Sequence, residues 1–307
     1  MQRLWKHVKE KKVRYLFILP AIIWFFIFCY MPMAGLVIAF KDYSLKDGIF
    51  GSIWAEPFFK NVTMFFDNPL LWIMIRNTVI VSLLKLITGF PAPIIFAVLL
   101  NECVFKRLRG VAQIISYLPF LISWVTVVAI LDAMLSPTGQ GGPLYNLITG
   151  MTGNEDVTYY MLESSWFLPL VIFTNIWKGV GWNSIIYVAA MRSISPELYE
   201  AAQIDGANRF SRVLHVTLPG ILPTMCLLFI MSLGSLASAG YEQIYLLQSP
   251  NNMEWSNVLD VYIITSGLNA GNYEIATVAG MFQSLFALIL TVAGNAAVRK
   301  LSDNSLW

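Results

Sequence analysis

Long runs of apolar residues dominate this chain of 307 residues. Six runs contain at most two charged residues each, and at about 1.5 Å of rise per residue each is long enough to cross about 30 Å of hydrocarbon as a helix. The six runs cover residues 15–40, 71–100, 110–135, 166–191, 218–241 and 275–298. Prolines interrupt several runs, which membrane helices tolerate because neighbouring helices satisfy the freed backbone groups. The pattern predicts an all-α integral membrane protein with six transmembrane helices.

Basic residues are unevenly distributed among the segments that connect these runs. Fourteen of the 20 lysines and arginines lie in residues 1–14, 101–109, 192–217 and 299–307. Positive residues near the ends of spans stay in the cytoplasm. The distribution therefore predicts that both termini are cytoplasmic, with a basic N-terminus over residues 1–14 and one transmembrane domain over residues 15–307. The first run is 26 residues long, longer than the about 7–15 residues of a signal-peptide core, which favours an uncleaved first span.

The composition agrees with a lipid environment and excludes several kinds of site. Hydrophobic residues make up 57% of the chain and charged residues 12%, against about 25% charged residues in soluble domains. No segment matches the phosphate-binding loop GxxxxGK[ST]. The three cysteines and two histidines lack the spacing of metal ligands. We expect no catalytic site, no metal site, no cofactor bound by this chain and no nucleic-acid partner.

The 192–217 loop, predicted to be cytoplasmic, carries the signals of a short helix. Ser195 suits the N-cap and Pro196 the first helical position, while Glu200 favours the positive end of the helix dipole. Gly206 suits the left-handed residue that ends a helix. By the spacing of three and four residues, one face of this helix would hold Leu198, Ala201, Ala202 and Asp205. A helix with small residues on one side can seat closely in a groove of another protein.

The same loop also has the spacing of a known motif. Glu-Ala-Ala is followed after three residues by glycine, then after nine by an aliphatic residue, and after one more by Leu-Pro, at Glu200, Ala201, Ala202, Gly206, Val216, Leu218 and Pro219. This pattern resembles the EAA loop of ABC importer permeases, which has isoleucine in the place of Val216. The resemblance extends over nearly the whole chain. It points to the branch that imports breakdown products of complex polysaccharides such as aldouronates, through segments 30–41, 85–93, 177–183, 239–248 and 305–307.

The resemblance implies a fold, a function and a set of partners. The implied fold is the type I ABC importer permease fold in the bacterial cell (inner) membrane. The implied function is ATP-driven import of oligosaccharides, including acidic, uronate-containing ones. The implied partners are a second homologous permease subunit, two ATPase subunits that bind ATP and Mg, an extracytoplasmic solute-binding protein and the lipid bilayer. In this family the EAA loop forms a coupling helix that docks into the ATPase, which assigns that role to Glu200, Ala201, Ala202, Asp205, Gly206, Leu218 and Pro219.

Polar residues inside the predicted spans are candidates for the substrate pathway, because polar groups in hydrocarbon are costly. Lys178 lies near the middle of the fourth run, among aromatic and amide side chains that suit a sugar ring. Its positive charge favours an acidic sugar. The candidate set is Lys85, Asn175, Trp177, Lys178, Trp182, Asn183 and Tyr187. Two alternatives stay open: an ion pair between Lys178 and Asp132, and an ion pair between Lys85 and a carboxylate of the partner subunit.

A stripe of small residues on the fifth run has two interpretations. The stripe contains Ser232, Gly234, Ser235, Ala237 and Ser238. Small residues let membrane helices pack closely, and the same residues could instead line a pore.

Two other functions stay open. The same architecture could import a glycerol-phosphate-like or a polyamine-like solute. A stand-alone secondary carrier would be expected to show related halves or paired broken helices, and the sequence has no convincing internal repeat.

Overall fold

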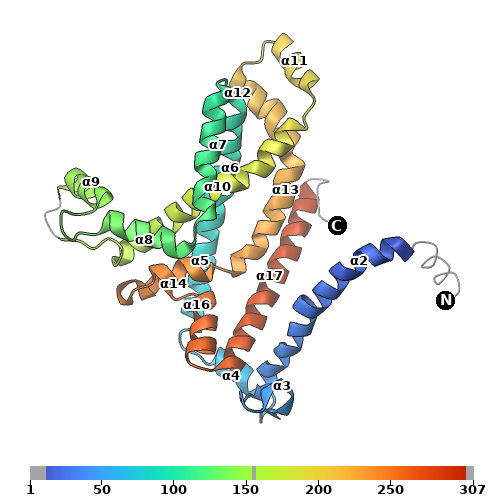
Figure 1. The fold of residues 1–307 in the computed structure, drawn as a ribbon, viewed down its shortest axis with the longest axis vertical. Helices are drawn as coiled ribbons and strands as arrows, with labels where there is room; N and C mark the ends of the chain where they lie inside the picture. Colours follow the sequence, from blue (N-terminus) through green and yellow to red (C-terminus); the bar gives the residue numbers. More distant parts are fainter. Residues whose placement is uncertain (1–11, 154–156, 302–307) are drawn as a thin grey trace. The chain divides into compact units, whose positions relative to one another are not determined.

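The computed structural model describes residues 12–153 and 157–301, which are mostly helical (Figure 1). The predicted basic N-terminus lies largely outside the described residues, and so does the ending at 302–307. The chain divides into two compact units. Unit 1 comprises residues 1–68 and 263–281, and unit 2 comprises residues 69–262 and 282–307.

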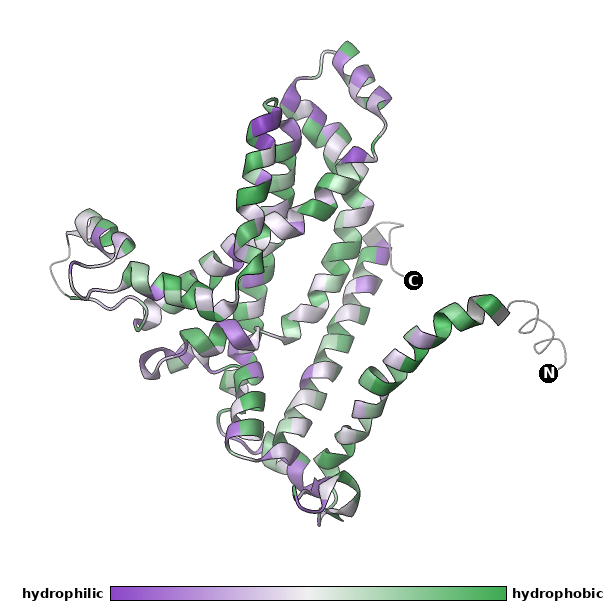
Figure 2. Ribbon diagram, in the orientation of Figure 1, coloured by the Kyte–Doolittle hydropathy of each residue, from purple (hydrophilic) through white to green (hydrophobic). Residues whose placement is uncertain are grey.

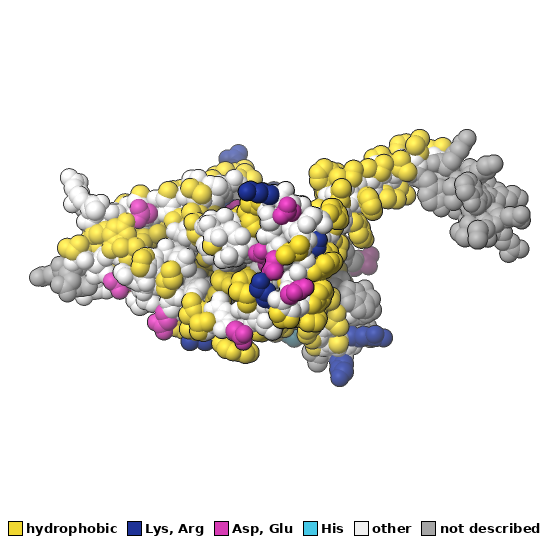
Figure 3. Space-filling model, turned by 90° about the horizontal axis from the view of Figure 1, so that it is seen from below, with side chains coloured by type: hydrophobic (Ala, Val, Ile, Leu, Met, Phe, Trp, Pro, Cys, Tyr) yellow, Lys and Arg dark blue, Asp and Glu magenta, His cyan; other side chains and the backbone are white. Residues whose placement is uncertain are grey.

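Unit 1 begins with one helical run whose pitch changes along its length. The run consists of α2 (Lys12–Phe25), the π-helical turn η1 (Phe26–Tyr30) and the 3₁₀ segment η2 (Met31–Phe40). Pro20 lies inside α2 and Pro32 at the start of η2. Each proline removes a backbone donor, which favours such local changes of pitch. Apolar side chains cover the run (Figure 3), so its surface suits a lipid environment.

The rest of unit 1 contains a small two-stranded sheet and short helices. Strands β1 (Lys41–Asp42) and β2 (Ile53–Trp54) pair antiparallel, with Lys41 opposite Trp54. The helical elements of unit 1 beyond the first run are α3 (Gly48–Gly51), α4 (Lys60–Phe66), η6 (Thr265–Asn269) and the first part of α17 (Tyr273–Leu301).

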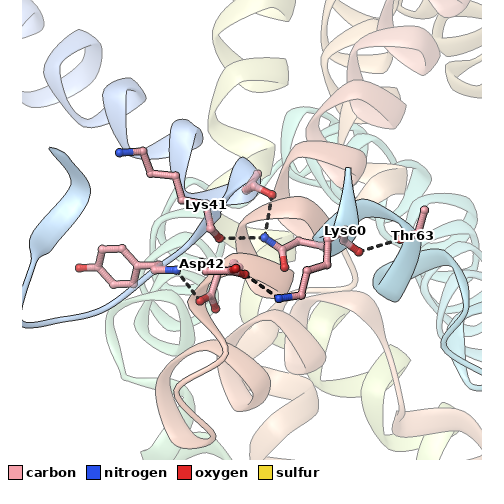
Figure 4. Close-up of polar contacts among 8 residues, drawn as sticks. Lys41, Asp42, Lys60 and Thr63 are labelled. Carbon is pink, nitrogen blue, oxygen red and sulfur yellow. Dashed lines mark hydrogen bonds and ion pairs between the residues drawn. The ribbon is translucent and has the colours of Figure 1, made fainter. Parts of the chain in front are cut away.

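Side-chain hydrogen bonds stabilise the sheet of unit 1 and join it to the neighbouring helix α4 (Figure 4). The Lys41 ammonium donates to the backbone carbonyl of Ser52 at 2.9 Å. Lys60 forms an ion pair with Asp42 at 2.8 Å. The buried Asn61 amide donates to the carbonyl of Lys41 at 2.9 Å. Three of these side chains are charged, so the short strands are positioned by polar contacts at the end of the apolar run.

Unit 2 is built almost entirely of helices. In chain order they are α5 (Leu71–Gly89), α6 (Pro91–Glu102), α7 (Lys106–Leu121), α8 (Trp124–Leu135), α9 (Pro143–Thr152), α10 (Ser164–Arg192), α11 (Pro196–Ile204), α12 (Arg209–Arg212), η3 (Val213–Thr217), α13 (Leu218–Gly234), η4 (Ser235–Ala237), α14 (Tyr241–Leu247), η5 (Pro250–Asn252), α15 (Met253–Ser256), α16 (Leu259–Ile264) and the remainder of α17.

Each predicted span coincides with a helix or a helical run, although the six differ in character. Within the described residues, four runs are both long and apolar enough to cross a membrane, and they are 16–40, 71–102, 209–237 and 273–300. The pair α7 and α8 would provide a fifth, with a bend of 104° between its two helices. The 29-residue α10 is long enough, but its lysine and asparagines lower its hydropathy. The count of six therefore stays a prediction.

Hydropathy along the ribbon separates the membrane helices from the 192–217 loop. Figure 2 shows hydrophilic residues gathered on α11 and at the start of α7, and hydrophobic residues along α2 and α13. This polar end of unit 2 agrees with the charge argument, which assigns the same segments to the cytoplasm.

Helix α10 is the centre of unit 2. It packs against α5, α6, α7, α13 and α14. Apolar side chains on two stretches of α10 belong to two separate cores, one around Phe167 and Val171 and one around Tyr187 and Met191. At Gly181, midway between them, α10 approaches α7 so closely that an added Cβ would lie 2.1 Å from the carbonyl oxygen of Ser116. Only glycine permits this contact.

Lys178 on α10 caps the carboxyl end of α7, where the bend toward α8 begins. Its ammonium donates to the carbonyl oxygens of Pro119 and Phe120, at 3.2 and 3.1 Å, and to that of Ile122. The last carbonyls of a helix have no partner within the helix, and inside a membrane no water replaces it. Lys178 therefore provides hydrogen bonds to backbone carbonyls that the bend leaves without a partner.

We expect Gly181→Ala to destabilise the protein by about 1–3 kcal/mol, the usual cost of overpacking, because the new methyl group would push α7 and α10 apart. The matched control is Gly110→Ala on α7, where an added Cβ meets nothing within 4 Å. Alanine favours a helix more than glycine does, so this control should be equally or slightly more stable. Thermal unfolding of the purified proteins in detergent measures both. Equal unfolding temperatures for Gly181→Ala and wild type would contradict the close approach.

We expect Lys178→Met to lower stability by about 1–3 kcal/mol, because it leaves the carbonyl groups at the end of α7 unpaired at the depth of the membrane. Lys106→Met, at the exposed start of α7, is the control and should change little. Thermal unfolding again gives the comparison, and transport assays add a second readout. A mutant of unchanged stability with an altered KM for the transported solute would instead assign Lys178 to the substrate pathway.

Candidate functional site

A pocket of about 590 Å³ lies among the helices of unit 2. Helices α5, α6, α10 and α13 form its walls, and the chain that follows η4 closes one side. The residues that line it are Ser82, Lys85, Leu86, Gly89, Phe90, Pro93, Asn175, Asn183, Ile186, Tyr187, Leu228, Met231, Ser232, Ser235, Ser238, Ala239 and Gly240. Apolar surfaces with a few polar groups are typical of ligand sites.

The side that follows η4 is a break between two helices. Residues 238–240 are not helical, and Gly240 adopts φ +87°, a value that favours glycine. Side chains from elsewhere satisfy the backbone of the break: Ser82 donates to the carbonyl of Ser238 at 2.9 Å, and Lys85 donates to the carbonyl of Ala239 at 2.5 Å. The break therefore brings backbone carbonyls to the pocket without leaving them unpaired.

Asp260 of α16 holds the other side of the same break. Its carboxylate accepts hydrogen bonds from the Ser238 hydroxyl at 2.6 Å, the backbone N–H of Ala239 at 2.7 Å and the Gln283 amide at 2.9 Å. Three donors, two of them side chains, therefore surround this carboxylate. Asp260 fixes the backbone conformation at the pocket wall.

Several polar groups at the pocket have unused hydrogen-bonding capacity. The hydroxyls of Ser232 and Ser235 donate to the carbonyls of Phe229 and Ser232, so their oxygens remain available as acceptors. Within the described part of the chain, the side chains of Asn175, Asn183 and Tyr187 make no hydrogen bond to the protein. Amides both donate and accept. The pocket thus offers both kinds of partner that the hydroxyl groups of a sugar need.

The structure divides the seven residues that sequence analysis proposed for the pathway. Lys85, Asn175, Asn183 and Tyr187 line one pocket, whereas Trp177, Lys178 and Trp182 do not. Trp182 stacks on Phe120 with ring centroids 4.5 Å apart, and Lys178 binds the end of α7. Helical periodicity alone does not explain the division, because positions 175, 178, 182 and 186 follow one another at spacings of three and four residues. The neighbouring helix α7 decides it, since Lys178 and Trp182 contact α7 residues instead of the pocket.

The alternative ion pair between Lys178 and Asp132 is not present in the structure. Lys178 binds carbonyl groups, and the Asp132 carboxylate accepts a hydrogen bond from the Tyr159 hydroxyl at 2.5 Å. This hydrogen bond raises the pKa of Tyr159 above its ordinary value. Asp132 therefore serves to hold the loop before α10.

The small-residue stripe on the fifth run contributes both to the pocket and to helix packing, while its lining of a pore stays a prediction. Ser232, Ser235 and Ser238 line the pocket. Gly234 faces another helix, where an added Cβ would lie 2.7 Å from the Thr291 hydroxyl of α17. The stripe therefore changes role between adjacent positions, since neighbouring residues on a helix point in different directions.

The 192–217 loop contains the expected short helix. Helix α11 starts with Ser195 at the N-cap position and Pro196 at the first position, although the Ser195 side chain makes no capping hydrogen bond. Gly206, with φ +78°, follows the helix, and the N–H of Ala207 reaches back to the carbonyl of Ala202 at 2.9 Å. This arrangement is typical of a helix ended by a left-handed glycine.

The α11 helix is largely exposed. Leu198 is 55% exposed and Ile204 86%, and α11 has no buried residue. The Tyr199 hydroxyl lies 3.1 Å from the Thr217 hydroxyl, which links α11 to the start of α13. Leu218 and Pro219, the last motif residues, form the first turn of α13. The helix is thus connected to a membrane span and presents apolar side chains outward.

Sequence analysis missed several residues that shape the pocket. Ser82, Ala239, Gly240 and Asp260 belong to this group. Asp260 had a recognisable signal, because it lies in the apolar segment 258–264, where a carboxylate is costly. Nothing in the sequence indicated that the helix breaks at Ser238. No cluster of three potential metal ligands occurs within residues 12–153 and 157–301.

Comparison with known proteins identifies relatives of nearly the same length. The polygalacturonan/rhamnogalacturonan transport system permease protein YteP of Bacillus subtilis (strain 168) is 37% identical, over 100% of this chain and 94% of its own length. Protein LplB of the same organism is also 37% identical, over 98% and 92% of the two chains. Both are similar along the whole length, so both units of the chain have counterparts in these relatives.

Solved structures show the same fold. A chain of a bacterial ABC transporter involved in the import of the acidic polysaccharide alginate superimposes with a TM-score of 0.86 and 39% identity, covering 98% of this chain and 99% of its own. A chain of the bacterial alginate ABC transporter in complex with an alginate pentasaccharide-bound periplasmic protein gives a TM-score of 0.87 at 38% identity, covering 99% of this chain and 100% of its own. The type I ABC importer permease fold expected from the EAA loop is therefore confirmed.

The family model described as "Binding-protein-dependent transport system inner membrane component" matches residues 89–303, which include the pocket helices α6, α10 and α13 and the whole 192–217 loop. Members of this family are transport subunits, in agreement with the expectation that the chain is not itself an enzyme. The chain belongs to the binding-protein-dependent transport system inner membrane components, as a multi-pass permease of an ABC importer.

Proposed function

We propose that this permease imports acidic oligosaccharides derived from polysaccharide breakdown. The observation that carries the proposal is the polar pocket of unit 2, whose volume of about 590 Å³ lies within the range of ligand sites, roughly 300–1,000 Å³. Its free amides, hydroxyl oxygens and ammonium group suit a hydroxylated and negatively charged solute. These groups lie on predicted membrane spans, where unpaired polar groups are otherwise costly.

The relatives support the same class of cargo. YteP is named for polygalacturonan and rhamnogalacturonan, and the alginate transporter imports an acidic polysaccharide. Polygalacturonan and alginate are both polymers of uronic acids. A preference for carboxylated sugars would account for the cationic group of Lys85 in the pocket of this chain.

We assign four of the candidate residues to the pathway. Lys85 on α5 and Asn175, Asn183 and Tyr187 on α10 line the pocket together. Trp177, Lys178 and Trp182 are left out, because Lys178 and Trp182 have structural contacts with the end of α7 and Trp177 lies outside the pocket.

The permease works as part of a larger assembly. A second homologous permease would supply the other half of the pathway, a solute-binding protein would deliver cargo from outside, and two ATPase subunits would hold ATP and Mg. The absence of a phosphate-binding loop in the sequence requires that another chain bind the nucleotide. The family description, which names binding-protein dependence, supports the external partner.

We propose further that the 192–217 loop couples the ATPase to the pathway. Helix α11 exposes Leu198 and Ile204 to the surroundings, and exposed apolar side chains on a short polar helix suit burial against a partner. The covalent continuation into α13 would transmit movement of α11 to the span that carries Ser232. The residues assigned to this coupling are Glu200, Ala201, Ala202, Asp205, Gly206, Leu218 and Pro219.

Reconstitution tests the function. Proteoliposomes that contain this chain, the second permease and the ATPases, supplied with ATP and the solute-binding protein, should take up labelled oligogalacturonate, and those that contain this chain alone should not. If glycerol phosphate or polyamines inhibited uptake and oligosaccharides did not, the cargo would be one of those solutes and not an oligosaccharide. Uptake by this chain alone, driven by an ion gradient, would identify a secondary carrier and overturn the proposal.

Gly206→Val should weaken docking of the ATPase without impairing membrane insertion. An added Cβ at Gly206 meets nothing within 4 Å, so the effect comes from the left-handed backbone, which costs a β-branched residue about 1–3 kcal/mol. Converted to affinity, this corresponds to about tenfold less ATPase retained on co-purification, with a matching loss of uptake.

The matched control for the loop is Gly153→Val. Gly153 has φ +62° and ends α9, and an added Cβ there also meets nothing within 4 Å. The backbone strain is therefore similar, but the site lies in a loop predicted to be outside the cell. Normal ATPase docking by Gly206→Val, or an equal loss in both variants, would contradict the coupling role.

A further inference from the structure

Lys85 is a charged side chain at the wall of the pocket with no carboxylate bound to it. It lies on the face of α5 that also places Ser82, Leu86 and Gly89 at the pocket. Its one hydrogen bond within the described residues goes to the carbonyl of Ala239, and no ion pair of Lys85 occurs among these residues. A cation in a membrane span is costly, and the nearby Asp260 carboxylate is a counter-charge that forms no ion pair with it among these residues.

The nearby carboxylate does not occupy the remaining donors of Lys85. Asp260 lies on the other side of the Ala239 backbone and accepts the N–H of that residue, while Lys85 binds its carbonyl. Asp260 also accepts hydrogen bonds from Ser238 and Gln283. Its oxygens are thus engaged by three donors, and its role is to hold the broken helix.

The Lys85 side chain lines the pocket and keeps donors for a ligand. An ammonium group has three donors, and one of them is used. Gly240 is the residue next to its carbonyl partner, and an added Cβ there would lie 3.5 Å from the Lys85 nitrogen. A side chain at this position would therefore touch the nitrogen, and glycine leaves that space empty.

The two lysines within the predicted spans of unit 2 differ in this respect. Lys178 donates to three backbone carbonyls at the end of α7, which accounts for all three of its donors. Lys85 donates to one. Of the two, only Lys85 has donors left for a ligand.

From these contacts we propose that Lys85 selects acidic cargo, by donating hydrogen bonds to a carboxylate of the sugar in the pocket. The inference rests on the proposed function and names the residue that recognises the charge. Asn175, Asn183 and the serine oxygens of α13 and η4 line the same pocket and provide partners for the sugar hydroxyls. Charge-assisted hydrogen bonds are stronger than neutral ones, so the carboxylate contact dominates the discrimination between acidic and neutral sugars.

Equilibrium binding to the purified complete transporter tests this role. The two probes are labelled trigalacturonate and the same trisaccharide with its carboxyl groups reduced to alcohols. Wild type should bind the acidic probe more tightly. Lys85→Gln should weaken its binding about tenfold or more, the usual effect of losing a charged hydrogen bond, while binding of the neutral probe changes less than about twofold. Lys85→Arg, which keeps the charge, should recover most of the affinity for the acidic probe.

Two further variants separate recognition from a purely structural role. Glutamine can still donate to the Ala239 carbonyl, whereas Lys85→Met cannot. If the carbonyl contact were the whole role of Lys85, Lys85→Met would unfold at a lower temperature, and Lys85→Gln would bind both probes as wild type does. Lys46→Gln removes a positive charge from an exposed loop of the same chain and should leave both affinities unchanged.

The outcomes distinguish this inference from the function on which it rests. Wild-type transporter that binds neither probe and imports no oligosaccharide would contradict the proposed function. A second set of outcomes would overturn only the role of Lys85 and leave the proposed function intact. In these, wild type binds the acidic probe, and Lys85→Gln either binds it equally well or loses both probes to the same extent. If Lys85→Gln fails to assemble, the two affinities of the wild-type transporter provide the test. Equal affinity for the acidic and the neutral probe would also overturn the proposal.

Discussion

A polar group inside hydrocarbon has no water to bind, so the protein or a ligand must satisfy it. This constraint explains most of the specific contacts in unit 2. Lys178 binds the carbonyls that the bend between α7 and α8 leaves free. Ser82 and Lys85 bind the carbonyls of the break at 238–240, and Asp260 accepts the N–H of Ala239. Charged side chains therefore make irregular backbone possible at the depth of the membrane.

The irregular backbone in turn creates the pocket. An unbroken helix through residues 209–247 would direct the carbonyls of Ser238 and Ala239 along its own axis. The break turns them toward α5, and α10 supplies the amides opposite. A binding site at a broken helix can also change shape when the helix moves, and α13 continues directly from the 192–217 loop. The same helix thus connects the proposed ATPase contact to the proposed cargo site.

Glycines set the distances in this arrangement in two different ways. Gly181 lets α10 and α7 touch at Ser116, where any side chain would collide with backbone. Gly206 and Gly240 instead supply backbone conformations with positive φ, one at the end of α11 and one at the pocket wall. Close packing and local chain direction are both needed, because a pocket between helices keeps its volume only if its walls are fixed.

The sequence alone determined the membrane character, the position of the helical runs, the short helix at Ser195 and its ending at Gly206, because these depend on local composition and turn chemistry. It also identified Lys85, Asn175, Asn183 and Tyr187 as polar residues within spans. Only the tertiary structure decided that these four share a pocket while Lys178 and Trp182 pack on α7, and that the fifth run breaks at Ser238. The physical reason is that the direction of a side chain and the partner of a backbone group depend on neighbouring helices, which are distant in the sequence.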